Sequence, residues 1–187
     1  MPKVAYLAGP DVFFPNAREH AARKVEICAK YRLRGLPPLS EEGGELSAEP
    51  SFEAWRVIYD RNLAAMEASD VIIANLTPFG GASADAGTLI EVGWFLGRDK
   101  PVFGYSNTRA GFSERMGDYL ALTGTAGQGF LVESFSLPDN LMIAGAVWSG
   151  GYPIFLPQDD DRRGLDALDV FEACVKAAAE LLAGGPA

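Results

Sequence analysis

The distribution of apolar residues along the chain predicts short buried strands that alternate with longer helices. Three mostly apolar runs are typical of strands buried on both faces: Val4 to Ala8, Val71 to Ala74, and Pro101 to Tyr105. Apolar residues recur at helical spacing in five further segments: Ala17 to Leu33, Phe52 to Ala68, Asp85 to Leu96, Leu137 to Val147, and Asp166 to Ala183. Strands and helices that alternate in this way favour a parallel sheet covered on both faces.

The pattern predicts an α/β fold, a single doubly wound domain of flavodoxin-like or Rossmann-like type with a central parallel sheet, over residues 1–187. We expect an irregular connection from Gly35 to Pro50 and an irregular excursion around 106–136. In such sheets ligands bind at the carboxyl ends of the strands. The pocket is therefore expected among three loops: Gly9 to Asn16, Thr77 to Ala84, and the chain from Ser106 onward.

Charge and scarce residue types exclude several classes of function. The 25 acidic residues outnumber the 16 basic ones, and a net charge of −9 disfavours binding to nucleic-acid polymers or anionic membranes. One histidine and two cysteines are too few for a Cys/His zinc site, so we expect no metal and no cofactor. His20 lies in a charged helical segment, where a solvated position is expected. Without a signal-peptide or membrane-spanning pattern, the protein is expected to be cytoplasmic, with Cys28 and Cys174 reduced.

The stretch from Asn75 to Gly93 holds the candidate chemistry. A glycine-rich loop leads into a helix there, but neither the Walker motif nor the Rossmann glycine spacing is present. Asp85 stands at the helix start, where it is either a helix cap or a ligand-binding carboxylate, and in both cases it repels a phosphate. A neutral ligand that carries hydroxyl groups therefore fits this loop better.

Glu91 stands further along the same predicted helix. Gly87 and Thr88, one turn earlier, leave room for a ligand beside it, and Trp94 and Phe95 follow one turn later. Glu91 is therefore either a solvated helix residue or a pocket carboxylate. Two carboxylates beside a sugar-sized pocket suit glycosyl chemistry.

Five motifs carry a resemblance to a known family. In chain order they are Tyr6-Leu-Ala-Gly-Pro, Ser69-Asp-Val-Ile-Ile-Ala-Asn-Leu-Thr-Pro-Phe, Asp85-Ala-Gly-Thr-Leu-Ile-Glu-Val-Gly, Lys100-Pro-Val-Phe-Gly-Tyr, and Pro138-Asp-Asn-Leu-Met-Ile. The ordered set, which covers most of the chain, resembles the nucleoside 2-deoxyribosyltransferases.

The resemblance implies a transferase whose nucleophile is Glu91. Glu91 would attack the anomeric carbon of a 2-deoxyribonucleoside and hold a covalent deoxyribosyl intermediate until a second nucleobase accepts the sugar. Tyr6 would orient Glu91, and Asp85 would accept a hydrogen bond from the 5′ hydroxyl of the sugar. Asn140 would act from a neighbouring subunit, which implies a homo-oligomer with shared active sites.

The resemblance also implies residues that bind the substrate. Gly9 and Gly87 lie in the matching segments, and Phe13, Phe14 and Phe79 could stack on the base. Structural interpretations stay open beside these roles. The aromatic residues, Tyr6 included, are also ordinary packing residues, and Asn140 is also an ordinary residue at a helix start.

One position departs from the family pattern. Relatives often have an aspartate that contacts and helps to protonate the base, whereas Asp60-Arg-Asn-Leu places Asn62 there. An amide hydrogen-bonds a base but does not act as an acid at neutral pH. Two alternatives to a transferase therefore remain: a hydrolase of nucleosides or deoxynucleoside monophosphates, and a non-catalytic nucleoside-binding protein.

Overall fold

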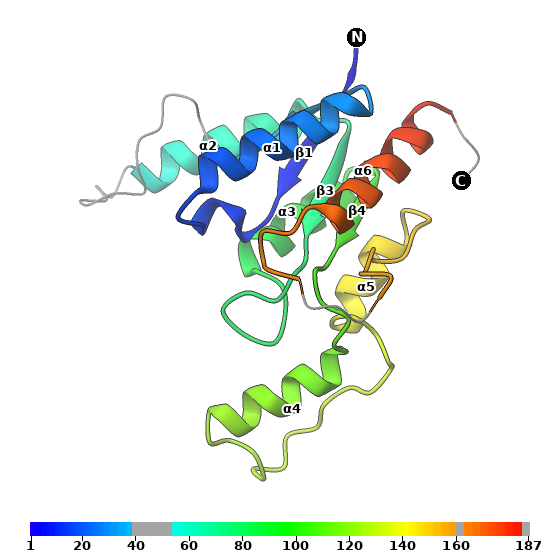
Figure 1. The fold of residues 1–187 in the computed structure, drawn as a ribbon. Helices are drawn as coiled ribbons and strands as arrows, with labels where there is room; N and C mark the ends of the chain where they lie inside the picture. Colours follow the sequence, from blue (N-terminus) through cyan, green and yellow to red (C-terminus); the bar gives the residue numbers. More distant parts are fainter. Residues whose placement is uncertain (39–53, 160–162, 185–187) are drawn as a thin grey trace.

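A four-stranded parallel sheet forms the centre of the molecule (Figure 1). The computed structural model describes residues 1–38, 54–159 and 163–184. The strands are β1 (Lys3–Ala8), β2 (Leu33–Leu36), β3 (Val71–Asn75) and β4 (Val102–Tyr105), and their order in the sheet is β2-β1-β3-β4. Each neighbouring pair is parallel, so the predicted α/β class is confirmed.

The order of the strands places a topological switch point between β1 and β3. From β1 the chain continues to β2 on one side, and from β3 it continues to β4 on the other. In open parallel sheets, the loops that leave two such strands diverge and form a crevice at their carboxyl ends. The loops after Ala8 and Asn75 are therefore the ones best placed to form a site.

The sequence pattern missed β2 and extended the first helix too far. Helix α1 (Ala17–Lys30) ends in a turn in which Arg32 has a positive φ of 63°, and β2 then runs beside β1. A strand of only four residues at the edge of the sheet is too short for its alternation to be recognised. The beginning of the predicted irregular connection therefore belongs to β2, and its residues 39–50 lie outside the described residues.

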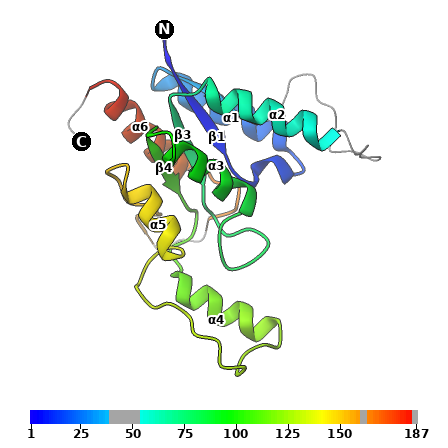
Figure 2. The same ribbon diagram turned by 180° about the vertical axis from the view of Figure 1, so that it is seen from behind.

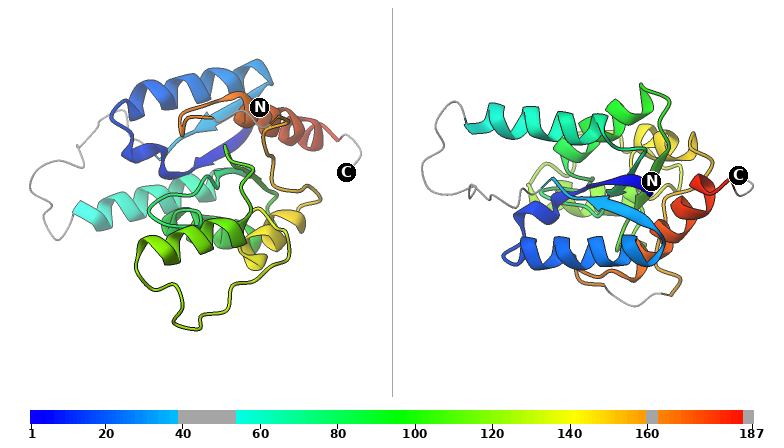
Figure 3. Two further views of the ribbon diagram at one scale, coloured as in Figure 1. Left: turned by 60° about the horizontal axis from the view of Figure 1, so that its bottom comes forward. Right: turned by 90° about the horizontal axis from the view of Figure 1, so that it is seen from above.

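Helices cover both faces of the sheet. One face is covered by α1 and α6 (Asp169–Leu182), and the other by α2 (Ala54–Glu67), α3 (Ala86–Leu96) and α5 (Leu141–Trp148), as the view from above in Figure 3 shows. Side chains of β1 alternate between the two faces, so Leu7 packs with α1 and α6 whereas Tyr6 packs towards α2, α3 and α5. This alternation places Tyr6 on the same side of the sheet as α3. Figure 2 shows the molecule from this side, with α2 and α3 in front of the sheet.

The remaining predicted helices are confirmed with shifted ends. Helix α3 starts at Ala86, α5 at Leu141 and α6 at Asp169. The described part of α2 starts at Ala54, and the predicted start at Phe52 lies outside the described residues.

Helix α4 (Phe112–Leu122) and the chain that follows it extend away from the sheet (Figure 1). The segment 106–136, which was expected to be irregular, therefore contains a helix. No residue of α4 is buried, but Phe112, Met116, Tyr119 and Leu120 recur at helical spacing, so the sequence held a signal for this helix.

Candidate active site

Tyr6 and Glu91 form a hydrogen-bonded pair at the centre of the candidate site. Tyr6 stands in β1 and is fully buried, and its hydroxyl group donates to Oε1 of Glu91 over 2.6 Å. Phe95, one turn after Glu91 on α3, stacks against the Tyr6 ring with centroids 6.0 Å apart. The strand and the helix therefore hold the Tyr6 hydroxyl in one position relative to the carboxylate.

The surroundings of Glu91 change its acidity. Burial raises the pKa of Glu91 to about 7, the hydrogen bond from Tyr6 opposes this rise, and the negative charge of Asp85 adds to it. Burial and the neighbouring Glu91 raise the pKa of Tyr6 far above its usual value. Tyr6 therefore remains a hydrogen-bond donor, while Glu91 exchanges its proton near neutral pH.

Asp85 caps α3, which confirms the structural interpretation of this residue. Its Oδ2 atom accepts from the backbone N–H of Thr88 over 2.9 Å and from the Thr88 hydroxyl group over 3.0 Å. Both bonds use Oδ2, so Oδ1 keeps its capacity to accept a hydrogen bond from a ligand. A Cβ atom on Gly87 would lie 3.1 Å from Oδ2 of Asp85, so a glycine at this position spares the cap a close contact.

The loops after β1 and β3 meet at the carboxyl ends of these strands. A Cβ atom on Gly9 would lie only 2.7 Å from Cβ of Asn75, so glycine is required where these two segments approach each other. Phe13 stacks on Phe79, with ring centroids 5.5 Å apart and an interplanar angle of 10°. Because 54% of Phe13 remains exposed, this aromatic pair presents a surface on which a further ring could pack.

The prediction for His20 is wrong. Its side chain is 1% exposed, its Nε2 atom lies 3.8 Å from Oδ2 of Asp11, and Phe14 packs edge-on against the ring. Burial lowers the pKa of His20. The 3₁₀-helix η1 (Pro10–Phe13) folds back over α1 and covers the imidazole, an arrangement that periodicity within the helix does not reveal.

The sequence pattern did not predict a buried polar network that lies beneath the loop after β1. Asp11 pairs with the ammonium group of Lys24, which is only 2% exposed, and accepts from Nδ2 of Asn75 over 2.6 Å. Oδ1 of Asn75 in turn accepts from the hydroxyl group of Thr77 over 2.6 Å. A signal was present, since Lys24 falls at helical spacing between the apolar residues Ala21 and Cys28.

Asn140 caps α5, so the helix-start interpretation of this residue is confirmed. Its Oδ1 atom accepts from the backbone N–H of Met142 over 3.0 Å, and its Nδ2 atom donates to Glu133 over 2.7 Å. Among the described residues, no hydrogen bond links Asn140 to Tyr6, Asp85 or Glu91. The chain brings Tyr6, Glu91 and Asp85 together through β1 and α3, whereas the side chain of Asn140 bonds Met142 and Glu133.

Asn62 lies on α2, the helix that packs on the Tyr6 side of the sheet. Met66, one turn later, belongs to the same buried cluster as Tyr6. The Oδ1 atom of Asn62 is buried, and no hydrogen-bond partner for it is present among the described residues. A buried amide oxygen without a partner is costly, and a ligand that donates a hydrogen bond would relieve that cost.

The fold and the site define a parallel α/β protein in which a tyrosine orients a buried carboxylate near the carboxyl ends of the strands. The sequence profile described as nucleoside 2-deoxyribosyltransferase matches residues 5–142. The chain belongs to the nucleoside 2-deoxyribosyltransferase family.

Three individual proteins are similar to this chain. A Schizosaccharomyces pombe protein described as uncharacterised is 30% identical over 165 residues, which cover 79% of this chain and 78% of that protein. The structure of a 2-desoxiribosyltransferase from Leishmania mexicana is similar with a TM-score of 0.62 and 26% identity, over 96% of this chain and 98% of that one. A conserved protein from Enterococcus faecalis V583 shares the fold, with a TM-score of 0.57 and 19% identity over 95% and 99% of the two chains.

Two further features are absent from the described residues. Across residues 1–38, 54–159 and 163–184, no helix combines the length and the hydrophobicity needed to cross a membrane. Within those ranges, no three His, Cys, Asp or Glu side chains gather as the ligands of a metal ion would.

Proposed function

We propose that the protein transfers 2-deoxyribose from one nucleobase to another through a covalent intermediate on Glu91. A carboxylate oxygen of Glu91 forms a bond to the anomeric carbon, and the bond from that carbon to the base nitrogen breaks. Its electron pair leaves with the base, which takes up a proton. A nitrogen of a second base then attacks the same carbon, loses its proton and releases the Glu91 carboxylate. Two such displacements retain the configuration of the sugar.

The hydrogen bond from Tyr6 to Glu91 is the observation that carries this proposal. A carboxylate that is buried enough to have a pKa of about 7 is poorly solvated and therefore more reactive than one in water. The Tyr6 hydroxyl group donates to Oε1 of Glu91. No described donor forms a hydrogen bond to Oε2 of Glu91, so Oε2 is left for the attack. Tyr6 also restricts rotation of the carboxylate, so the attacking oxygen is positioned before the substrate binds.

Neighbouring groups support a nucleoside as the substrate. The Oδ1 atom of Asp85 would accept a hydrogen bond from the 5′ hydroxyl group of the sugar. A 5′ phosphate would be repelled by the negative charge of Asp85, which disfavours a nucleotide. The base would pack on the Phe13–Phe79 pair beside Gly9. Asn62 would contact the base through its amide. Because an amide is not an acid at neutral pH, the departing base would take its proton from water or from another residue.

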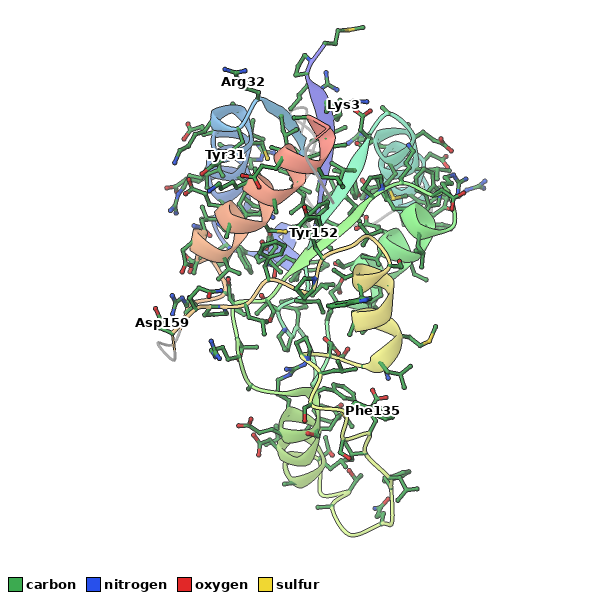
Figure 4. The ribbon with its side chains drawn as sticks, turned by 90° about the vertical axis from the view of Figure 1, so that its right-hand side faces the viewer. Lys3, Tyr31, Arg32, Phe135, Tyr152 and Asp159 are labelled. Carbon is green, nitrogen blue, oxygen red and sulfur yellow. The ribbon has the colours of Figure 1, made fainter. Side chains whose placement is uncertain are left out.

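The proposal includes a homo-oligomer in which Asn140 of one copy reaches the site of another. Large apolar side chains of α4, α5 and the intervening segment are at least 64% exposed: Leu122, Phe130, Leu131, Phe135, Met142 and Trp148. Figure 4 shows Phe135 beside α4, far from Lys3 at the opposite end of the molecule. Exposed apolar side chains of this kind favour association with another chain, and two of them, Met142 and Trp148, lie on the helix that Asn140 caps.

An exchange assay separates the three candidate functions. Deoxyinosine and adenine are incubated with the protein, and the nucleosides are followed by chromatography. New deoxyadenosine identifies a transferase, free deoxyribose without new nucleoside identifies a hydrolase, and saturable binding without turnover identifies a binding protein. The variant Glu91→Ala is expected to abolish exchange, whereas Glu26→Ala, an exposed position on α1, is expected to retain it. Full activity of Glu91→Ala would contradict the proposed nucleophile.

A further inference from the structure

Asp139 joins three segments of the chain at one buried carboxylate. Its side chain is 1% exposed. Oδ1 accepts from the Ser83 hydroxyl group over 2.6 Å and from the backbone N–H of Asn140 over 2.8 Å, and Oδ2 accepts from the backbone N–H of Ala84 over 3.1 Å. The guanidinium group of Arg115 lies 3.6 Å from Oδ2.

Arg115 holds the same region from the other side. It stands on α4, yet its side chain is only 12% exposed, on a helix without a buried residue. Its Nε donates to the carbonyl oxygen of Ala82 over 2.8 Å, Nη2 donates to that of Pro138 over 2.8 Å, and Nη1 donates to that of Ala110. A planar guanidinium group can serve several acceptors in fixed directions, which a lysine cannot do.

The positions of these contacts connect them to the candidate site. Ala82, Ser83 and Ala84 directly precede Asp85, and all three are held by Arg115 or Asp139. Asn140 directly follows Asp139, which holds its backbone N–H. One ion pair therefore fixes the chain next to Asp85, which would contact the sugar in this chain's site, and next to Asn140, which would contact the sugar in the site of a neighbouring copy. Tyr6 and Glu91 are held independently, by β1, α3 and Phe95.

We infer that Arg115 and Asp139 are positioning residues that set Asp85 against the sugar in this chain's own site and Asn140 against the sugar in the site of a neighbouring copy. This inference rests on the proposed function, because it takes a nucleoside as the ligand. The pair would govern recognition of the 5′ hydroxyl without changing the Tyr6–Glu91 nucleophile. Removing either residue would therefore weaken discrimination by the hydroxyl group more than it weakens the attack itself.

The test compares two donors that differ only in this hydroxyl group. Values of kcat/KM are measured for deoxyinosine and for its 5′-deoxy analogue, with adenine as the acceptor, in the wild type and in Arg115→Met and Asp139→Asn. The ratio of the two values is expected to fall by about 10-fold or more in both variants, since misplacement of a binding group by about 1 Å commonly costs this much. Arg115→Lys, which keeps the charge but not the planar fork, is expected to give an intermediate ratio.

Arg98→Met is the matched control. Arg98 is a half-exposed arginine that lies on Trp94, just beyond the far end of α3, and its loss is expected to leave the ratio unchanged. Equal losses on both donors in the Arg115 and Asp139 variants would overturn the inference, because they would indicate general destabilisation. A wild type that transfers both donors equally well would also overturn it, since no hydroxyl contact would exist to be positioned.

Hydrogen exchange tests the pair without any turnover. Asp139→Asn is expected to accelerate exchange of the amides in 82–88 and 139–143 while the amides of β1 and β3 stay protected. Unchanged exchange in both segments would overturn the inference. A wild type without activity on either donor would refute the proposed function. The hydrogen-exchange measurement would then still show whether Arg115 and Asp139 hold the segments 82–88 and 139–143.

Discussion

Glu91 shows how strongly a residue depends on its surroundings. In a solvated helix it would be an ordinary carboxylate, but burial brings its pKa to about 7 and Tyr6 supplies its hydrogen-bond donor. The proposed role as nucleophile requires the ionised form of Glu91, whereas burial favours the protonated form. Activity and stability therefore respond to pH in opposite directions at this residue.

The first prediction concerns the pH dependence of the proposed transfer. The pKa of Glu91 is about 7, and attack requires the carboxylate, so kcat/KM is expected to rise through about pH 7 and to decrease tenfold per pH unit well below it. The hydrogen bond from Tyr6 lowers this pKa, so Tyr6→Phe is expected to shift the midpoint to higher pH as well as to reduce the rate. The measurement is a pH profile of the exchange reaction.

Tyr31 offers a control of the same chemical kind. Its hydroxyl group also donates to a glutamate, Glu172, over 2.9 Å, but on the face of the sheet that α1 and α6 cover. Figure 4 shows Tyr31 beside these helices, far from Phe135. Tyr31→Phe is expected to leave the midpoint unchanged. A midpoint that stays in place in Tyr6→Phe would contradict the role of Tyr6.

The second prediction concerns stability. The folded pKa of Glu91 is raised above the unfolded value of about 4.5, so its contribution to stability is fully present below pH 4.5 and is lost as pH rises through 7. Glu91→Gln keeps an acceptor for the Tyr6 hydroxyl group and is uncharged at every pH. The variant therefore avoids the cost of ionising a buried carboxylate. Its free energy of unfolding is therefore expected to exceed that of the wild type at pH 8 by on the order of 2 kcal/mol, and by less at pH 5. Denaturant titrations at the two pH values measure the difference, and a constant difference would contradict the prediction.

At the scale of elements, the site depends on the close approach of the loops that leave β1 and β3. Gly9 allows this approach, and the Asp11–Asn75 hydrogen bond and the Phe13–Phe79 stacking follow from it. The two loops diverge at the switch point of the sheet, and these contacts bridge them. The same helix, α3, then carries both Asp85 at its start and Glu91 within it.

The third prediction tests this approach. Gly9→Ala places a Cβ atom 2.7 Å from Cβ of Asn75 at a positive φ of 153°, so the variant is expected to lose about 1–3 kcal/mol of stability and to bind deoxynucleosides more weakly. Gly93→Ala is the matched control, because a Cβ atom there meets nothing within 4 Å. Alanine in a helix is expected to raise stability by up to about 1 kcal/mol at that position. Equal effects of the two substitutions would contradict the prediction.

At the scale of the whole molecule, the protein described here is one chain of a proposed oligomer. Exposed apolar side chains lie on α4 and α5, and Asn140 caps α5 and donates to Glu133. A second copy that covers this surface would bury it and bring Asn140 to a neighbouring site. The site would then be complete only between chains.

The fourth prediction follows from this sharing. Glu91→Ala and Asn140→Ala are each expected to be nearly inactive, whereas their mixture after subunit exchange is expected to regain about a quarter of wild-type activity if dimers pair at random. Mixing Glu91→Ala with Glu91→Gln, which lack the same group, is the control and is expected to regain nothing. A mixture no more active than its components would contradict shared sites.

Much of the fold was predictable from local patterns. Buried strands such as Val71–Asn75 are continuous apolar runs, and α3 has a cap at Asp85 that marks its start. The edge strand β2 was not predictable, because four residues are too few to leave a periodic signal, whereas α4 was missed although Phe112, Met116 and Tyr119 recur at helical spacing. Tyr6, Asp85 and Glu91 could be selected as candidates from their motifs, and the structure brings these three together.

By itself, the sequence determined the fold class and the three candidate side chains, because apolar runs and short motifs depend on neighbours along the chain. Only the tertiary structure decided the state of groups whose partners are distant in sequence. It buried His20 beneath η1 and paired Lys24 with Asp11. It raised the pKa of Glu91 to about 7, and it joined Arg115, Asp139 and Ala84 at one carboxylate. Desolvation and hydrogen bonding depend on what surrounds an atom in space, and these surroundings exist only after the chain has folded.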